Sequence, residues 1–284
     1  MEIVSTVDEV RQRVKEWKSQ GLRVGLVPTM GYLHEGHKSL IDRAVTENDR
    51  VVVSVFVNPI QFGPAEDLAT YPRDLDMDSA VCQKAGAALI FHPEPGEMYP
   101  DDFCTYIDMD VLTEGLCGKT RPTHFRGVCT VVGKLFHIVE PDAAYFGQKD
   151  AQQLAVIRRM VRDLNFHLEI VGCPIVREED GLAKSSRNTY LSEEERRAAV
   201  ILHRGLVRGE ELLRQGEKCA SVIIRTVTEV IQSEPLARID YVEIVDYENL
   251  QPLEEIHGSV LMAVAVYIGK TRLIDNFIVE DTLK

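Results

Sequence analysis

Hydrophobic residues in the first 175 positions alternate between short continuous runs and longer stretches with helical spacing. The runs are rich in valine and other strand-forming residues, which is typical of strands buried on both faces. They predict strands at 23–27, where Pro28 is expected to end the strand, and at 50–56, 88–91, 143–146 and 168–172. The stretches between them predict helices at 6–20, 39–45, 75–86, 124–139 and 150–164. Strands and helices in this order predict an α/β domain with a parallel sheet over residues 1–175.

The pattern changes after Pro174. A helix is expected to begin after Ser192, a second helix is predicted near 217–233, and three longer strands are predicted at 238–246, 259–268 and 271–279. These elements predict a smaller α+β domain over residues 176–284. Capping-box spacing supports two helix starts, at Thr6 with Glu9 and at Ser192 with Glu195. The charged, glycine-containing segment 174–190 is typical of a hinge between domains.

Composition narrows the classes of function. The chain has 45 acidic and 32 basic residues, and its net charge of −13 is spread as −7 over residues 1–175 and −6 over residues 176–284. This balance argues against nucleic acid or a membrane surface as a partner, because both are anionic. The longest strongly apolar run, at 260–269, is shorter than the roughly 18–20 residues of a membrane span, and the N-terminal residues lack the pattern of a secretory signal. We therefore expect a cytoplasmic protein.

The cysteines give no sign of a metal or redox centre. They are widely spaced and include no C-x-x-C pair, so we expect reduced and mostly buried side chains. They lie at Cys82, Cys104, Cys117, Cys129, Cys173 and Cys219.

The segment PTMGYLHEGHKSL (28–40) carries the strongest chemical signal. It follows a predicted buried strand and leads into a predicted helix, which is where open α/β sheets bind ligands. At a helix start, His34 and His37 share one face beside unpaired backbone N–H groups, an arrangement that suits a phosphate. Gly31 and Gly36 allow the backbone to approach a nucleotide. A zinc pair is the alternative, but the order is H-E-G-H rather than H-E-x-x-H and no third ligand is evident.

Three aspartates, Asp74, Asp76 and Asp78, alternate like the start of a calcium loop. The sixth and twelfth positions are Ser79 and Ala85, where such a loop needs glycine and glutamate, so calcium is excluded. An acidic first turn that complements the helix dipole is the simpler interpretation. No metal site built from protein side chains is predicted.

The H-E-G-H sequence after a strand resembles the H-x-G-H signature of the nucleotidyltransferase superfamily. More of the chain resembles one member, the pantothenate synthetase (pantoate–β-alanine ligase) family, in segments 28–37, 53–78, 121–154 and 176–192. The resemblance implies a homodimer with a Rossmann-like nucleotide- and pantoate-binding domain and a smaller domain that closes over the active site. It also implies a ligase for pantothenate biosynthesis. Such a ligase condenses pantoate with β-alanine through a pantoyl-adenylate, uses ATP with Mg²⁺, and releases AMP and pyrophosphate.

The resemblance places ATP-binding residues in three segments. They are Met30, Gly31, Tyr32, Leu33, His34, Glu35, Gly36 and His37, then Gly147, Gln148, Lys149 and Asp150, and finally Val176, Lys184, Ser185, Ser186 and Arg187. In the family, the residue that matches His37 is the proton donor. His34, Lys149 and Arg187 are its expected catalytic partners, because positive groups must converge on the phosphate oxygens as pyrophosphate leaves.

The sequence K-S-S-R (184–187) resembles the K-M-S-K-S loop of the superfamily. Many relatives have Met or Leu at the position of Lys184, so we expect a backbone contact there. A plain surface loop is the alternative, because this composition is common in polar loops.

Gln61 and Gln153 are the substrate-binding candidates. A neutral amide donates and accepts hydrogen bonds, which fits the hydroxyls and carboxylate of pantoate, and the family has its pantoate-binding glutamines at these positions. Asn58 is a weaker candidate for the same pocket.

Asp78 and Asp150 are candidates for placing Mg²⁺ indirectly. The histidines at 124 and 137 are expected to be structural.

Two other functions stay open at this point. Another H-x-G-H nucleotidyltransferase would release pyrophosphate without needing an amine. A regulatory module with the same fold would bind nucleotide without turnover. Ligand-dependent formation of AMP separates the three.

Overall fold

The computed structural model describes residues 1–64 and 66–280, which divide into two compact units. The first unit comprises Met1–Asp110, Arg121–Gln148 and Val156–Pro174 within the described residues. The second comprises Val111–Thr120, Lys149–Ala155 and the described part of Ile175–Lys284. Two segments from the first 175 residues thus group with the second unit, while the division of function at residue 175 stays a prediction. Within the described ranges, no helix is long and apolar enough to cross a membrane.

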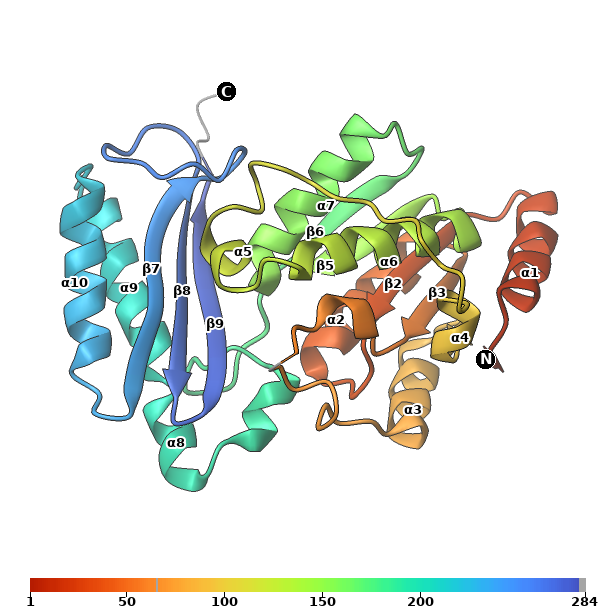
Figure 1. Cartoon of the computed structure of the whole chain (residues 1–284), viewed down its shortest axis with the longest axis horizontal. Helices are drawn as coiled ribbons and strands as arrows, with labels where there is room; N and C mark the ends of the chain where they lie inside the picture. Colours follow the sequence, from red (N-terminus) through yellow and green to blue (C-terminus); the bar gives the residue numbers. More distant parts are fainter. Residues whose placement is uncertain (65, 281–284) are drawn as a thin grey trace. The chain divides into compact units, whose positions relative to one another are not determined.

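A six-stranded parallel sheet forms the centre of the first unit, in the order β1-β4-β3-β2-β5-β6. Figure 1 labels its strands β2, β3, β5 and β6. The strands are β1 (Glu2–Val4), β2 (Val24–Thr29), β3 (Arg50–Val55), β4 (Leu89–Phe91), β5 (Ala143–Gly147) and β6 (Glu169–Cys173). The chain proceeds from β2 towards β4 on one side and from β5 to β6 on the other. The order therefore reverses between the neighbouring strands β2 and β5, and ligands of such sheets bind at the carboxyl ends of strands at this point.

Helices cover the faces of this sheet, as the alternating pattern predicts. They are α1 (Val7–Ser19), α2 (Glu35–Glu47), α3 (Leu75–Ala85), α6 (His124–Val139) and α7 (Ala151–Asp163). The short helix α4 (Pro95–Met98) was not predicted. On one face, Leu40, Ile41 and Ala44 of α2 and Cys82 of α3 join a core with the strands. Helices α1 and α6 pack against each other and against β2. The Rossmann-like prediction for this part of the chain is confirmed.

The end predicted for the strand at 23–27 is wrong, because this strand, β2, continues through Pro28 to Thr29. The amide of Asp142 donates to the carbonyl of Val24. The backbone N–H and C=O groups of every second residue of β2 from Val24 onward therefore point towards β5. Pairing with β5 ends at Leu26. The missing N–H of Pro28 therefore points to the side where no ladder continues, and the strand tolerates the proline.

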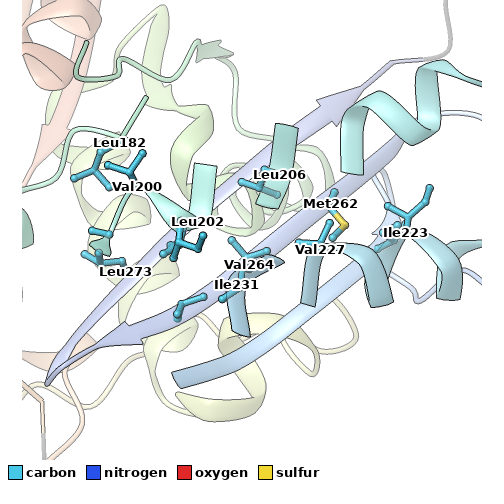
Figure 2. Packing of buried hydrophobic residues seen from close by; sticks show 14 of the residues in the cluster. Leu182, Val200, Leu202, Leu206, Ile223, Val227, Ile231, Met262, Val264 and Leu273 are labelled. Atoms are coloured by element: carbon cyan, nitrogen blue, oxygen red, sulfur yellow. The ribbon is translucent and has the colours of Figure 1, made fainter. Parts of the chain in front are cut away.

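The second unit contains a three-stranded antiparallel sheet in the order β7-β8-β9. Its strands are β7 (Ala237–Asp246), β8 (Val260–Ile268) and β9 (Thr271–Val279), and its helices are α5 (Leu116–Thr120), α8 (Glu193–Ala198), α9 (Ile201–Arg214) and α10 (Ala220–Gln232). Figure 2 shows how Leu206 of α9 and Val227 of α10 pack with Met262 and Val264 of β8. The α+β prediction is confirmed. The helix that begins after Ser192 is short, however, and α9 is an additional element that was not predicted.

Candidate active site

The two histidines of the H-x-G-H segment form the N-terminus of helix α2, at the carboxyl end of β2. His34 is the N-cap residue, and its Nδ1 accepts a hydrogen bond from the amide of Gly36 (3.1 Å). The Nδ1 of His37 accepts from the amide of His34 (3.3 Å). The two rings lie 4.1 Å apart between centroids. This is a capping box in which both side chains are imidazoles.

The capping box sets the tautomer of both rings. A neutral imidazole has one N–H and one acceptor nitrogen. Because each Nδ1 accepts a backbone N–H, the proton of each neutral ring is on Nε2. Both histidines therefore present an Nε2–H donor at the positive end of a helix dipole, as phosphate binding requires.

Asp78 holds the loop that leads into these histidines. This carboxylate is 1% exposed and lies in α3. It accepts hydrogen bonds from the amides of Leu33 (2.6 Å) and Tyr32 (3.0 Å). Burial raises the pKa of Asp78, although the two backbone hydrogen bonds act in the opposite direction. Both carboxylate oxygens are engaged by the loop, so Asp78 holds the backbone of this segment.

Glycine is required at position 31 of this loop. Gly31 has a φ of +82°, and a Cβ atom there would lie 2.9 Å from Oδ2 of Asp78. Tyr32 also has a positive φ, of 52°. The sequence interpretation of Gly31, which invoked close approach of a nucleotide, missed this requirement of the fold itself.

Gln61 is buried and connects the loop to a polar cluster in the first unit. Its Oε1 accepts from Nδ2 of Asn58 (2.9 Å), and its Nε2 donates to Sδ of Met30 (3.1 Å). Asn58 is 1% exposed and also bonds to the carbonyl of Gly127 (3.1 Å) and the hydroxyl of Tyr99 (2.7 Å). The structure thus brings the candidates Gln61, Asn58 and Met30 together, and Asn58 is the more deeply buried of the two amides.

The histidines that were expected to be structural make contacts of that kind. His124 is buried and its Nδ1 bonds to the backbone oxygen of Gln61 (3.1 Å). The ring of His137 lies against Phe166, with centroids 5.2 Å apart.

In the second unit, Lys149 and Asp150 lie in a 3-10 turn, Gln148–Asp150, that begins in the first unit after β5 and leads into α7. The Nζ of Lys149 is 3.8 Å from Oδ1 of Asp150. Gln153 lies in the first turn of α7 and is partly exposed. The neighbouring Gln152 is buried, and its amide bonds to the backbone of the segment 112–117. Sequence reasoning missed Gln152.

The loop with Lys184 and Arg187 begins as a small hairpin. The amide of Lys184 donates to the carbonyl of Val176 (2.9 Å), and Nζ of Lys184 pairs with Glu178 (2.8 Å). Ser185 then caps a 3-10 turn, Ser186–Tyr190, by accepting from the amide of Arg187 (3.3 Å). The side chain of Lys184 thus has an acidic partner inside the hairpin, which supports the expectation that its backbone matters more.

The predicted site residues fall into two groups. Those of the first unit are Met30 to His37, Gln61, Gly147 and Gln148, and those of the second are Lys149, Asp150, Gln153, Val176 and Lys184 to Arg187. Across the described ranges, no cluster of three or more His, Cys, Asp or Glu side chains has the arrangement of a metal site. All six cysteines are free; four are buried, whereas Cys104 and Cys219 are exposed.

Comparisons with known proteins agree over almost the whole chain. The model of the family described as Pantoate-beta-alanine ligase matches residues 2–278. The pantothenate synthetase of Clostridium acetobutylicum is 62% identical, with 98% of this chain and 99% of the relative covered. That of Enterococcus faecalis is also 62% identical, with 99% of each chain covered.

Solved structures give the same result. Pantothenate synthetase from Thermus thermophilus superposes with a TM-score of 0.93 at 50% identity, over 98% of this chain and 99% of that chain. Pantoate-beta-alanine ligase from Francisella tularensis, complexed with beta-gamma ATP and β-alanine, has a TM-score of 0.79 at 34% identity, over 98% of this chain and 97% of that chain.

Proposed function

Because this chain belongs to the pantoate-beta-alanine ligase family and is an ATP-dependent ligase, we propose that His34, His37, Lys149 and Arg187 carry out its first chemical step. The reaction condenses pantoate with β-alanine to pantothenate through a pantoyl-adenylate and releases AMP and pyrophosphate. The observation that carries the assignment is the double-histidine capping box at the start of α2. It sets two Nε2–H donors where the order of the parallel sheet reverses.

In the first step, a carboxylate oxygen of pantoate attacks the α-phosphorus of ATP. The bond from that phosphorus to the bridging oxygen breaks, and negative charge develops on the departing pyrophosphate. Donors aimed at this charge stabilise the transition state more than the ground state. His37 supplies such an N–H, His34 and the helix N-terminus support it, and Lys149 and Arg187 are the further cations for the phosphate oxygens.

In the second step, the amine of β-alanine attacks the acyl carbon of pantoyl-adenylate. The carbon–oxygen bond to AMP breaks, the amide forms and the amine loses a proton. The substrate carries the activated bond, so the enzyme needs no covalent nucleophile of its own. Holding the amine beside the acyl carbon is the main requirement.

Pantoate recognition is assigned to Gln61 and Gln153. Two contacts support Gln61: its amide is oriented by Asn58, and its Nε2 reaches Met30 in the proposed ATP loop. A neutral amide holds a carboxylate without the strong pairing of an arginine fork, so the carboxylate keeps its nucleophilicity.

Mg²⁺ fits this chain as a partner of ATP and not as an ion in a protein cage. Magnesium commonly uses one or two carboxylates together with substrate phosphates and water. Since Asp78 is engaged by the backbone, Asp150 is the aspartate we assign to the neighbourhood of the ion. When bound, Mg²⁺ neutralises charge on the leaving pyrophosphate. A homodimer, as the resemblance implies, and a cytoplasmic location, as the sequence pattern predicts, complete the proposal.

The experiment measures pyrophosphate and AMP with pantoate and ATP, with and without β-alanine. We expect one pyrophosphate per site without β-alanine and continuous release of both products with it. His37→Ala should fold and lose adenylation by about 10²–10³-fold, comparable with deleting one transition-state donor. His137→Ala, a histidine outside the site, is the control. Near-normal pyrophosphate release from a folded His37→Ala protein would contradict the assignment.

Two other results would replace the proposal. Pyrophosphate release that does not depend on pantoate would point to another nucleotidyltransferase. Nucleotide binding without turnover would point to a regulatory module.

A further inference from the structure

We propose that Asn276, on strand β9, is a positioning residue that orients Lys149 for adenylation; this inference rests on the role proposed above for Lys149. The Nδ2 of Asn276 donates a hydrogen bond to the backbone oxygen of Lys149 (2.9 Å). Both residues belong to the second unit. The contact joins the edge strand of the C-terminal sheet to the 3-10 turn that carries the lysine, across 127 positions of sequence.

The placement of Asn276 within β9 makes this bond specific. Asn276 is 4% exposed and stands opposite Ala263 of β8 in the antiparallel register. The small alanine leaves room for the amide. Asparagine is unfavourable in strands, and a buried amide must be hydrogen-bonded to offset its loss of hydration. The bond to Lys149 therefore supplies a physical reason for a buried asparagine at this position.

The adjacent residue, Asp275, holds the other cationic segment. Its carboxylate is 3% exposed and forms a two-pronged pair with Arg177, at 2.7 and 2.9 Å. Arg177 also donates to the carbonyl of Gly181 (3.0 Å), in the hairpin that leads to Lys184 and Arg187. Successive side chains of a strand point to opposite faces. Strand β9 thus holds the Lys149 turn through one face and the hairpin through the other.

The expected consequence of losing the Asn276 bond is a displaced lysine. The side chain of Lys149 extends from a short turn, and one of the groups that hold its backbone is the amide of Asn276. A shift of about 1 Å in a catalytic group can cost up to about 10²-fold in rate. The loss should fall on kcat, because Lys149 acts on charge that develops in the transition state, while ATP also binds through other groups.

The test compares two variants of Asn276 with a matched control on the same strand. Asn276→Ala removes the amide, and Asn276→Asp keeps its size but replaces the donor with an acceptor. We expect both to lower kcat for pyrophosphate release by about 10- to 100-fold, with a much smaller change in KM for ATP. The control, Leu273→Val, alters a buried β9 residue of the helix-covered core whose side chain has no polar group to offer Lys149. It should lower thermal stability and keep kcat.

A double-mutant cycle distinguishes the proposed role of Lys149 in adenylation from the proposed role of Asn276 in positioning it. In a Lys149→Ala background, Asn276→Ala should cause little further loss of adenylation, because both changes act through one side chain. If Lys149→Ala itself keeps full adenylation, the proposed role of Lys149 is wrong. If Lys149→Ala is impaired and Asn276→Ala is not, only the positioning inference is overturned. Additive losses in the double variant would also overturn it. Asn276→Ser takes the place of Asn276→Ala if the alanine variant fails to fold.

Discussion

Removing the carboxylate of Asp78 should release the loop that precedes the two histidines. Asp78→Ala deletes both acceptors and leaves the amides of Tyr32 and Leu33 without their partner in a buried place. A buried donor left unsatisfied costs about 1–3 kcal/mol. Two such donors predict a loss of about 2–5 kcal/mol in the free energy of unfolding at neutral pH.

Asp78→Asn distinguishes the effect of losing the negative charge from the effect of losing both hydrogen-bond acceptors. Asparagine keeps one oxygen acceptor and avoids the cost of burying a charge, which is the main cause of the raised pKa of Asp78. We therefore expect about half the loss of Asp78→Ala, roughly 1–2 kcal/mol. Both variants should also slow pyrophosphate release, because the loop they loosen carries the N-cap histidine of α2.

The pH dependence provides an independent check. Burial raises the pKa of Asp78 in the folded protein above its ordinary value. At pH values between the ordinary and the raised pKa, the folded state therefore binds a proton that the unfolded state has already released. The contribution of this proton to stability is lost as pH rises through the raised pKa. The wild type should lose this contribution of Asp78 over that range of pH. Asp78→Asn, which cannot titrate, should lack this part of the change.

Urea unfolding followed by tryptophan fluorescence measures the stability, since the single tryptophan, Trp17, is buried in α1 of the first unit. The control is Asp74→Ala. Asp74 caps the same helix by accepting from the amide of Met77 (2.9 Å) and does not hold the loop. It should lose about 1 kcal/mol, the usual cost of an N-cap, with normal adenylation. An Asp78→Ala protein with wild-type stability and wild-type adenylation would refute the reasoning.

Two further predictions concern substrate and loop residues. Gln61→Ala and Gln153→Ala should each weaken pantoate use and leave ATP affinity largely intact; calorimetry that shows the reverse would mean that the two pockets were exchanged. Lys184→Met should be nearly silent, because the Lys184 ammonium pairs with Glu178, whereas Arg187→Ala should impair pyrophosphate release because it removes a planar, always-charged group. Equal damage from the two loop variants would identify Lys184 as a direct phosphate ligand.

Most strands of the fold were predictable because a sheet covered on both faces needs continuous apolar runs. The missed strand β1 is three residues long and partly exposed, so it leaves no such run. Its pairing with β4 joins positions 87 residues apart, and only the folded chain shows it. The helix after Ser192 was predicted from its cap, but no local signal in that prediction marked its end at Ala198.

At the candidate site, sequence reasoning singled out residues by their side-chain chemistry and missed the groups that hold the backbone. The histidine pair stands out because its spacing places both rings at one helix end. The support of that loop comes from Asp78, which the sequence suggested as part of an acidic first turn or as an indirect aid in placing Mg²⁺. A carboxylate that accepts hydrogen bonds from two amides of a distant loop cannot be distinguished, by its local sequence, from a carboxylate that faces solvent.

The adjacent glutamines of α7 show the physical reason why local sequence does not reveal which polar side chain holds distant backbone. Residues 152 and 153 are identical in type, and successive positions on a helix differ by about 100° in direction. Gln152 points into the second unit, where its amide accepts from Cys117 and donates to the carbonyls of Leu112 and Gly115, each at 2.9 Å. Gln153 is the partly exposed neighbour. Both N–H groups of Gln152 are committed to backbone carbonyls, so its amide has no donor left for pantoate. The choice between the two glutamines therefore depends on contacts with residues 35–40 positions away and not on the local sequence.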